Sequence, residues 1–116
     1  MKSLYRVIDA DSWAEALKKG VVPRCQSDER ADRVHLNTEE SVEAVANLYF
    51  VQAEKPIALE IDPTEFSSAI YWLEPSEQKP WPQPCARISN IPLGSVVAIH
   101  GLEFDRREAR FRLIRK

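Results

Sequence analysis

The sequence predicts an α+β protein in which helices pack on a largely antiparallel β-sheet. Two segments with helix signals fall in the first fifty residues, each after a short run typical of a strand. The rest of the chain is mostly short alternating runs separated by turn residues, which indicates a succession of strands. Early helices followed by many strands are typical of the α+β class.

The first strand is predicted over Ser3–Asp9, where aromatic and β-branched residues alternate with others. A helix follows and ends at Gly20, a residue type that is common just after the last helical turn. Asp9 or Asp11 can accept hydrogen bonds from the free amides at the start of this helix. Its apolar positions, which include Trp13, are spaced to face a sheet.

A second strand and helix are predicted after a polar segment. Residues 23–32 show no apolar period, so we expect a loop there. A short strand over 33–37 comes next, and a helix begins at Asn37 or Thr38 and ends near Phe50.

The remaining elements are predicted to be strands and turns. Four prolines between residues 75 and 84 exclude a central strand, so this segment is predicted to be a surface loop with Trp81 at its centre. One helical turn is expected at 63–66 and a turn at 90–95, and strands are expected at 56–62, 69–74, 86–89, 96–104 and 108–116. The last two strands form a predicted hairpin that turns near 105–108.

The 116 residues suit a single domain, with a core over about residues 3–102 and a basic C-terminal strand over 103–116. Residues 105–116 carry six basic and two acidic side chains. Such a basic edge can attract phosphate groups, or its charges can simply prevent edge-to-edge pairing. We favour the second interpretation because no row of aromatic residues accompanies the arginines.

The composition also limits compartment and chemistry. We find no apolar run of membrane-spanning length and no signal-peptide segment, which predicts a cytoplasmic protein without a membrane partner. Cys25 and Cys85 are therefore expected to be reduced. Two histidines 65 positions apart, without cysteine–histidine spacing, predict no metal site. A glycine-rich phosphate loop, a nucleophile elbow and an HExxH motif are all missing from the sequence.

Several short matches in a fixed order nevertheless carry a family resemblance. They are Trp13, Gly20, "VHLN" at Val34–Asn37, the pair Trp72 and Glu74, and "IPLGSVVAI" at 91–99. In these features residues 3–102 resemble a small, largely bacterial family known as domain of unknown function 952, or DUF952.

That family is in turn similar to the ADP-ribosyltransferase superfamily, which implies a split antiparallel sheet with an NAD cleft between its halves. The resemblance places Arg6 where the first strand contacts the ribose or phosphate of the ligand. It places His35, Asn37 and Thr38 on the nicotinamide side, where a helix start also favours an anion. With Trp81 nearby, these residues would bind NAD or another nucleotide-like ligand.

The sequence departs from the superfamily at the position of the catalytic glutamate. The stretch that should hold a glutamate reads "CARIS" at 85–89. His35 and Glu74 are the remaining catalytic candidates. A cleft without a correctly placed acid loses the main stabilisation of the transition state, so the sequence favours ligand binding over transferase activity.

Each candidate also has a purely structural interpretation. Arg6 can pair with Glu60 or Asp62 on a neighbouring strand. His35 points away from Val34 and Leu36, toward either a cleft or a core.

The other candidate residues also have both a structural and a ligand-binding interpretation. Asn37 and Thr38 can serve only as helix caps. Trp72 is expected in the core, and Trp81 can cover a pocket or fill a gap.

The sequence thus leaves two classes of function. The first is a nucleotide-binding domain with an ADP-ribosyltransferase-like fold. The alternative is a non-catalytic protein-interaction or RNA-end-binding module on the same scaffold. We do not expect nucleic acid to be the main partner, and the sequence specifies no protein partner.

Overall fold

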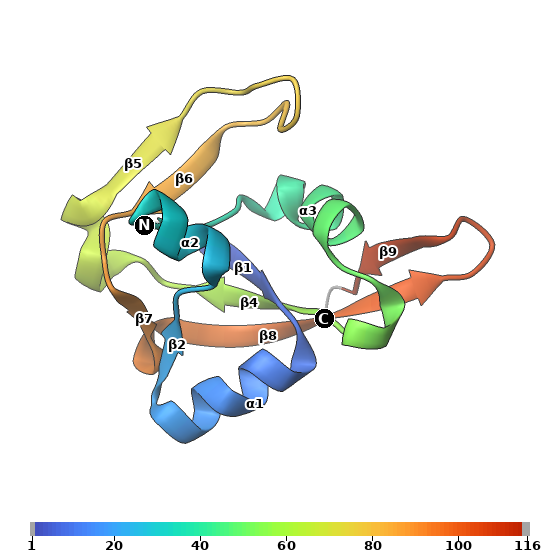
Figure 1. The fold of residues 1–116 in the computed structure, drawn as a ribbon, viewed down its shortest axis with the longest axis horizontal. Coiled ribbons are helices and arrows are strands. Elements are labelled where there is room, and N and C mark those ends of the chain that lie inside the picture. The colour runs from blue at the N-terminus through green and yellow to red at the C-terminus, as the bar shows by residue number, and fades with distance from the viewer. Residues whose placement is uncertain (1, 115–116) are drawn as a thin grey trace.

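The structure of this chain is a computed structural model, and it describes residues 2–114. Two antiparallel sheets and a small ribbon form the framework (Figure 1). The larger sheet has the order β1 (Leu4–Ile8), β4 (Ile57–Ile61), β8 (Val96–Asp105), β9 (Arg110–Leu113). The smaller sheet has the order β3 (Val34–His35), β6 (Gln83–Ala86), β5 (Ile70–Leu73). The ribbon pairs β2 (Val21–Pro23) with β7 (Asn90–Pro92).

The α-helices of the described chain are α1 (Ala10–Lys19), α2 (Gln26–Ala31) and α3 (Val42–Tyr49). Short 3-10 turns lie at Glu39–Ser41, Gln52–Glu54, Thr64–Ala69 and Leu93–Ser95. Within residues 2–114 no helix is long and apolar enough to cross a membrane. The predicted α+β class and the antiparallel pairing are confirmed.

The larger sheet separates two core clusters. Alternate residues of β1 face opposite sides, so Leu4 and Ile8 join a cluster that includes Ala16 of α1. Tyr5 and Val7 join a second cluster, beneath α3. The two longer helices therefore lie on opposite faces of this sheet (Figure 1).

The ends of α1 follow the sequence prediction. The carboxylate of Asp9 accepts a hydrogen bond from the backbone N–H of Ser12 at 3.0 Å. Gly20 has a φ of 79°, and its N–H donates to the carbonyl of Ala16 at 2.9 Å. Both residues act locally, through the termini of one helix.

The loop predicted over residues 23–32 is wrong, because α2 occupies most of it. The helix has no apolar period that could have revealed it. Its inward contact is a fully buried carboxylate, Asp28, which also accepts a hydrogen bond from the N–H of Cys25 at the start of the helix. A helix anchored by a buried polar group rather than an apolar stripe gives no periodic signal.

The proline-rich loop was predicted too long. Residues 83–86 form β6, the central strand of the smaller sheet, and Pro84 lies within it. The carbonyl of Pro84 accepts a hydrogen bond from the N–H of Leu36, but a proline has no N–H to return. The pairing of β3 therefore ends at His35, and the sheet tolerates the proline at that point.

The segment at 90–95 was predicted to be a turn, yet it begins with strand β7. Its partner β2 lies where no strand was expected. Each strand of this ribbon is three residues long, too short to show alternation in the sequence.

Among the described residues, one isolated bridge joins the backbones of the two main sheets. The backbones of Tyr5 and Asn37 exchange two hydrogen bonds of 2.7 Å, which form an isolated bridge between β1 and the end of β3. The rest of this junction is made by side chains.

The C-terminal hairpin is an edge, as predicted, but it also belongs to the core. Phe111 of β9 is only 3% exposed and packs in the cluster beneath α3. The packed core thus extends past the boundary expected near residue 102. Arg115 and Lys116 of the predicted basic strand lie outside the described residues.

Candidate functional site

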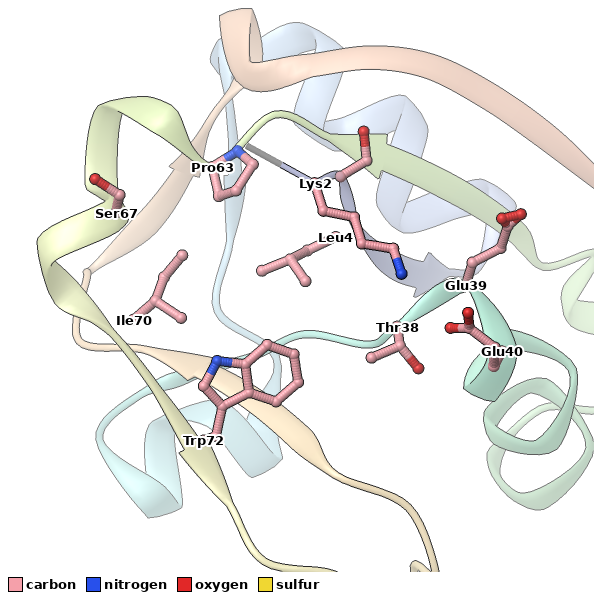
Figure 2. Close-up of a pocket in the computed structure, with 10 residues that line it drawn as sticks. Lys2, Leu4, Thr38, Glu39, Glu40, Pro63, Ser67, Ile70 and Trp72 are labelled. Atoms are coloured by element: carbon pink, nitrogen blue, oxygen red, sulfur yellow. The ribbon is translucent and has the colours of Figure 1, made fainter.

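A pocket of about 350 Å³ opens between the start of β1 and the inner face of β5 (Figure 2). Its walls are mainly apolar, and they include Leu4, Pro63, Ile70 and Trp72. Two polar residues, Thr38 and Ser67, also line the pocket. This combination of apolar walls and a few polar groups is typical of small-molecule sites.

Trp72 forms an exposed aromatic wall of the pocket. It was expected in the core, but 53% of it is exposed, so that expectation is wrong. β5 is an edge strand and its residues alternate in direction, which turns Trp72 and Ile70 toward the space beside β1. Figure 2 shows the indole lying across the pocket between Ile70 and Thr38.

Charged side chains surround one side of the opening. Lys2, Glu39 and Glu40 line this side, next to Thr38 (Figure 2). The hydroxyl of Thr38 donates to Ser41 at 3.2 Å and retains its acceptor capacity. Thr38 is therefore a pocket residue rather than a side-chain helix cap.

A second polar site is a buried network centred on Asp28 of α2. One carboxylate oxygen accepts from a guanidinium nitrogen of Arg6 at 2.6 Å, as part of an ion pair. The other oxygen lies 2.7 Å from Nδ1 of His35 and also accepts from the backbone N–H of His35 at 3.0 Å. Arg6 completes the network by donating to the carbonyl of His35 at 2.6 Å.

Burial and the paired charges shift the pKa values of Asp28 and Arg6 in opposite directions. Asp28 is fully buried and Arg6 is 8% exposed. Burial alone would raise the pKa of Asp28, but hydrogen bonds from His35 and Arg6 and the charge of Arg6 hold it far below its ordinary value. Burial would lower the pKa of Arg6, but Asp28 raises it above its ordinary value. Both groups are therefore charged at neutral pH.

The structural interpretation of Arg6 needs a correction. Its partner is Asp28, rather than Glu60 or Asp62 on the neighbouring strand. Since Asp28 and the carbonyl of His35 occupy both terminal nitrogens, Arg6 has little capacity left for a ligand phosphate.

His35 points away from Val34 and Leu36, as alternation predicts, and those two residues are core. Its side chain is 21% exposed and is held through Nδ1. Among the described residues Nε2 has no hydrogen-bond partner, and it is not a buried unpaired atom. Nε2 therefore reaches the surface.

The predicted site residues thus do not share one cleft. Thr38 lines the pocket, whereas Arg6 and His35 belong to the Asp28 network and are not pocket-lining residues in the described chain. Asn37 is buried and its backbone forms the bridge to Tyr5.

The two remaining candidates lie elsewhere. Trp81 is half-buried in the loop before β6, with its indole N–H buried and unpaired. Glu74 is exposed just beyond the end of β5. Neither lines the pocket in residues 2–114.

Sequence reasoning missed Asp28 because it lies among several acids in a segment taken for a loop. One local signal was present. Cys25 and Asp28 have the spacing of a helix cap and the third helical residue, and the N–H of Cys25 donates to Asp28 at 3.1 Å. That signal identifies a helix start, but it does not reveal the distant partner Arg6.

A smaller polar cluster lies on the α3 side of the larger sheet. Nε2 of His100 is 2.8 Å from the carboxylate of Glu60, and the hydroxyl of Ser3 donates to the same carboxylate at 2.9 Å. Hydrogen bonds from His100 and Ser3 hold the pKa of Glu60 below its ordinary value. No group of three or more His, Cys, Asp or Glu residues between residues 2 and 114 is arranged to hold a metal ion.

Residues 7–98 match the family described as protein of unknown function (DUF952). The chain belongs to this family. The DUF952 match includes Asp28, His35 and Trp72 but begins just after Arg6. It ends within β8, so the C-terminal hairpin lies beyond it.

Three solved structures of the protein CC0527 from Caulobacter crescentus have a similar fold. Its X-ray structure has a TM-score of 0.80 at 16% identity and covers 96% of this chain and 94% of that chain. An X-ray structure of a CC0527 double mutant has a TM-score of 0.79 at 16% identity, with the same coverage. The solution NMR structure has a TM-score of 0.72 at 17% identity, covering 92% and 90%. No curated protein sequence matches the chain.

Proposed function

We propose that this DUF952 protein is a binding domain with an ADP-ribosyltransferase-like fold that holds a nucleotide-like ligand in the pocket beside Trp72. NAD is one ligand of that class. The observation that carries the proposal is the half-exposed Trp72 ring in the wall of an apolar pocket.

The shape and chemistry of the pocket support a flat, largely uncharged ring. A tryptophan face that stacks on a base contributes about 1–3 kcal/mol and accepts any base. The side chains of Thr38 and Ser67 also line the pocket, and the ammonium of Lys2 lies at its opening beside Glu39 and Glu40. The volume of about 350 Å³ suits a base and part of its ribose.

We propose ligand binding only, without a catalysed transfer reaction. The pocket carboxylates, Glu39 and Glu40, come from the segment before α3, whereas the transferase acid would come from a late strand. We therefore assign no transfer reaction to His35 or Glu74.

Calorimetric titration with NAD, AMP and nicotinamide mononucleotide tests the proposal. Trp72→Ala is expected to weaken binding about tenfold or more, because the stacking surface is removed. Trp72→Phe should retain most of the affinity, since it keeps an aromatic face. Leu48→Ala is the control, because Leu48 is 56% exposed on α3 and does not line the pocket. Absence of binding by all three ligands, or equal affinity of Trp72→Ala and wild type, would contradict the proposal.

The alternative role of the basic hairpin in binding RNA ends or a protein gains less support. Arg112 pairs with Glu108 at 2.7 Å and with Asp105 at 3.2 Å, and Arg110 pairs with Glu43 at 3.1 Å. These local carboxylates reduce the positive charge that the hairpin presents to a partner. We do not extend the proposal to this surface.

A further inference from the structure

We propose a phosphate-binding site on the outer face of the smaller sheet, where Arg33 and Arg87 lie beside Tyr71. Tyr71 and Trp72 are neighbours in β5 and point to opposite faces of the strand, so this site is separate from the Trp72 pocket. The proposal does not depend on the function proposed for that pocket.

Strand register brings the residues of this site together. His35, Cys85 and Tyr71 are direct partners across β3, β6 and β5, so they form a row on one face. Arg33 precedes His35 by two positions, and Arg87 follows Cys85 by two. Because side chains alternate, both arginines project from the same face as the row.

Two positive charges converge on one ring. The guanidinium carbon of Arg87 lies 4.0 Å from the centre of the Tyr71 ring, and that of Arg33 lies 5.6 Å from it. An aromatic face attracts a cation but does not neutralise it. Within residues 2–114 neither arginine forms an ion pair with a carboxylate. The two like charges therefore share one aromatic ring and have no carboxylate partner among the described residues.

The surrounding groups do not supply the missing negative charge. Burial raises the pKa of the Cys85 thiol despite a hydrogen bond from Arg33, so this thiol is neutral. The carboxylate of Asp28 is already neutralised by Arg6, and the carboxylate of Asp32 pairs with Arg24 at 2.8 Å.

The arrangement fits the chemistry of a phosphate group. A guanidinium presents a planar fork of N–H donors that matches phosphate oxygens. Arg87 is exposed, and Arg33 and Tyr71 are partly exposed, so an anion can reach them from solvent. At the other end of the row, the free Nε2 of His35 offers a further polar contact. A small phosphomonoester and a nucleic-acid backbone share this chemistry.

NMR titration of the full chain tests the site through the arginine Nε–Hε signals. The probes are inorganic phosphate, ribose 5-phosphate and a ten-nucleotide RNA strand. The RNA arm uses Trp72→Ala as its host, so that base stacking in the pocket does not contribute. Binding of the small phosphates indicates a phosphomonoester site, and binding of the RNA alone indicates a backbone site.

The matched variants are Arg87→Gln and Arg107→Gln, because both arginines are exposed and only the first lies at Tyr71. We expect Arg87→Gln to weaken phosphate binding about fivefold to tenfold, and Arg107→Gln to leave it unchanged. Arg33→Gln should have a similar effect, and the Arg87 variant suffices if that protein does not fold. The proposal is overturned if no probe shifts the Arg33 and Arg87 signals, or if the two matched variants weaken binding equally.

Discussion

Among single residues, Asp28 makes the largest number of contacts that depend on its charge. Its carboxylate accepts hydrogen bonds from Arg6, His35 and the N–H of Cys25, although it is fully buried. The three partners come from β1, β3 and the start of α2. A buried charge of this kind is tolerated only while its partners remain, because an uncompensated charge in the interior is costly.

Asp28→Asn is therefore expected to lower the free energy of unfolding by about 3–5 kcal/mol, since it leaves Arg6 buried without an anion. Urea denaturation monitored by circular dichroism measures the change. Asp32→Asn is the control, because the side chain of Asp32 is 92% exposed and its ion pair with Arg24 contributes at most about 1 kcal/mol. If Asp28→Asn does not fold, combining it with Arg6→Met should restore folding, because no buried charge is then left unpaired and the amide oxygen of asparagine still accepts from backbone N–H groups. Equal effects of the two asparagine variants would show that the network does not stabilise the fold.

Residues with local roles could be predicted from the sequence, and residues with distant partners could not. Asp9 and Gly20 act within one helix, and alternation alone gave the direction of His35. The pair of Arg6 and Asp28 joins positions 22 residues apart through the tertiary fold, and no spacing rule selects Asp28 among its acidic neighbours. Trp72 is exposed because β5 is an edge strand. The order of strands in a sheet cannot be predicted from the residues of one strand.

Among the elements, the edge strand β9 depends on side chains from α3. The N–H of Phe111 donates to the side-chain oxygen of Asn47 at 2.7 Å, and the amide of Asn47 donates back to the carbonyl of Phe111 at 3.2 Å. Glu43 accepts a hydrogen bond from the N–H of Leu113 at 2.9 Å. These bonds extend the strand pairing with contacts to a helix, which covers the free edge of the sheet.

We expect Asn47→Ala to destabilise the protein by about 1–3 kcal/mol, because it leaves two backbone groups of Phe111 without partners. Hydrogen exchange of the Phe111 amide should accelerate at the same time. Asn90→Ala is a suitable comparison, since the side chain of Asn90 makes only a 3.4 Å contact to Ser89. An unchanged exchange rate at Phe111 would argue against a role of Asn47 in fixing β9.

Elements with a clear period were predicted correctly, whereas short elements were missed. β1, α1, β4 and β8 all follow the expected alternation or helical spacing. α2 has no apolar period, and β2 and β7 are three residues long, too short to show alternation, so the rest of the fold has to hold these elements in place. Pro84 is tolerated within β6 because its missing N–H lies where the pairing with β3 ends.

For the molecule as a whole, the distribution of carboxylates predicts sensitivity to acid. Hydrogen bonds from Ser12 outweigh burial and lower the pKa of Asp9, and those from Thr64 lower the pKa of Asp62. The pKa values of Asp28 and Glu60 are lowered as well. At acidic pH the unfolded chain therefore binds more protons than the folded protein does, so stability falls as pH decreases.

The free energy of unfolding is expected to change little between about pH 7 and about pH 5, and to decline below about pH 4.5, where unfolded carboxylates begin to take up protons. Urea denaturation at a series of pH values measures this decline. It should be shallower in Asp28→Asn, which lacks the most strongly shifted group. A stability that is constant or rising from pH 5 to about pH 3 is incompatible with these pKa directions.

The order of the strands also determines when the protein can assemble during its synthesis. β1 is synthesised before its partner β4, which follows α3, and β4 lies between β1 and the still later β8. β3 likewise waits for β6. Neither sheet can be completed while the first half of the chain emerges, so the apolar residues of β1 stay unpaired during that time. Such an unpaired apolar strand is prone to aggregate until its partner strands have been made.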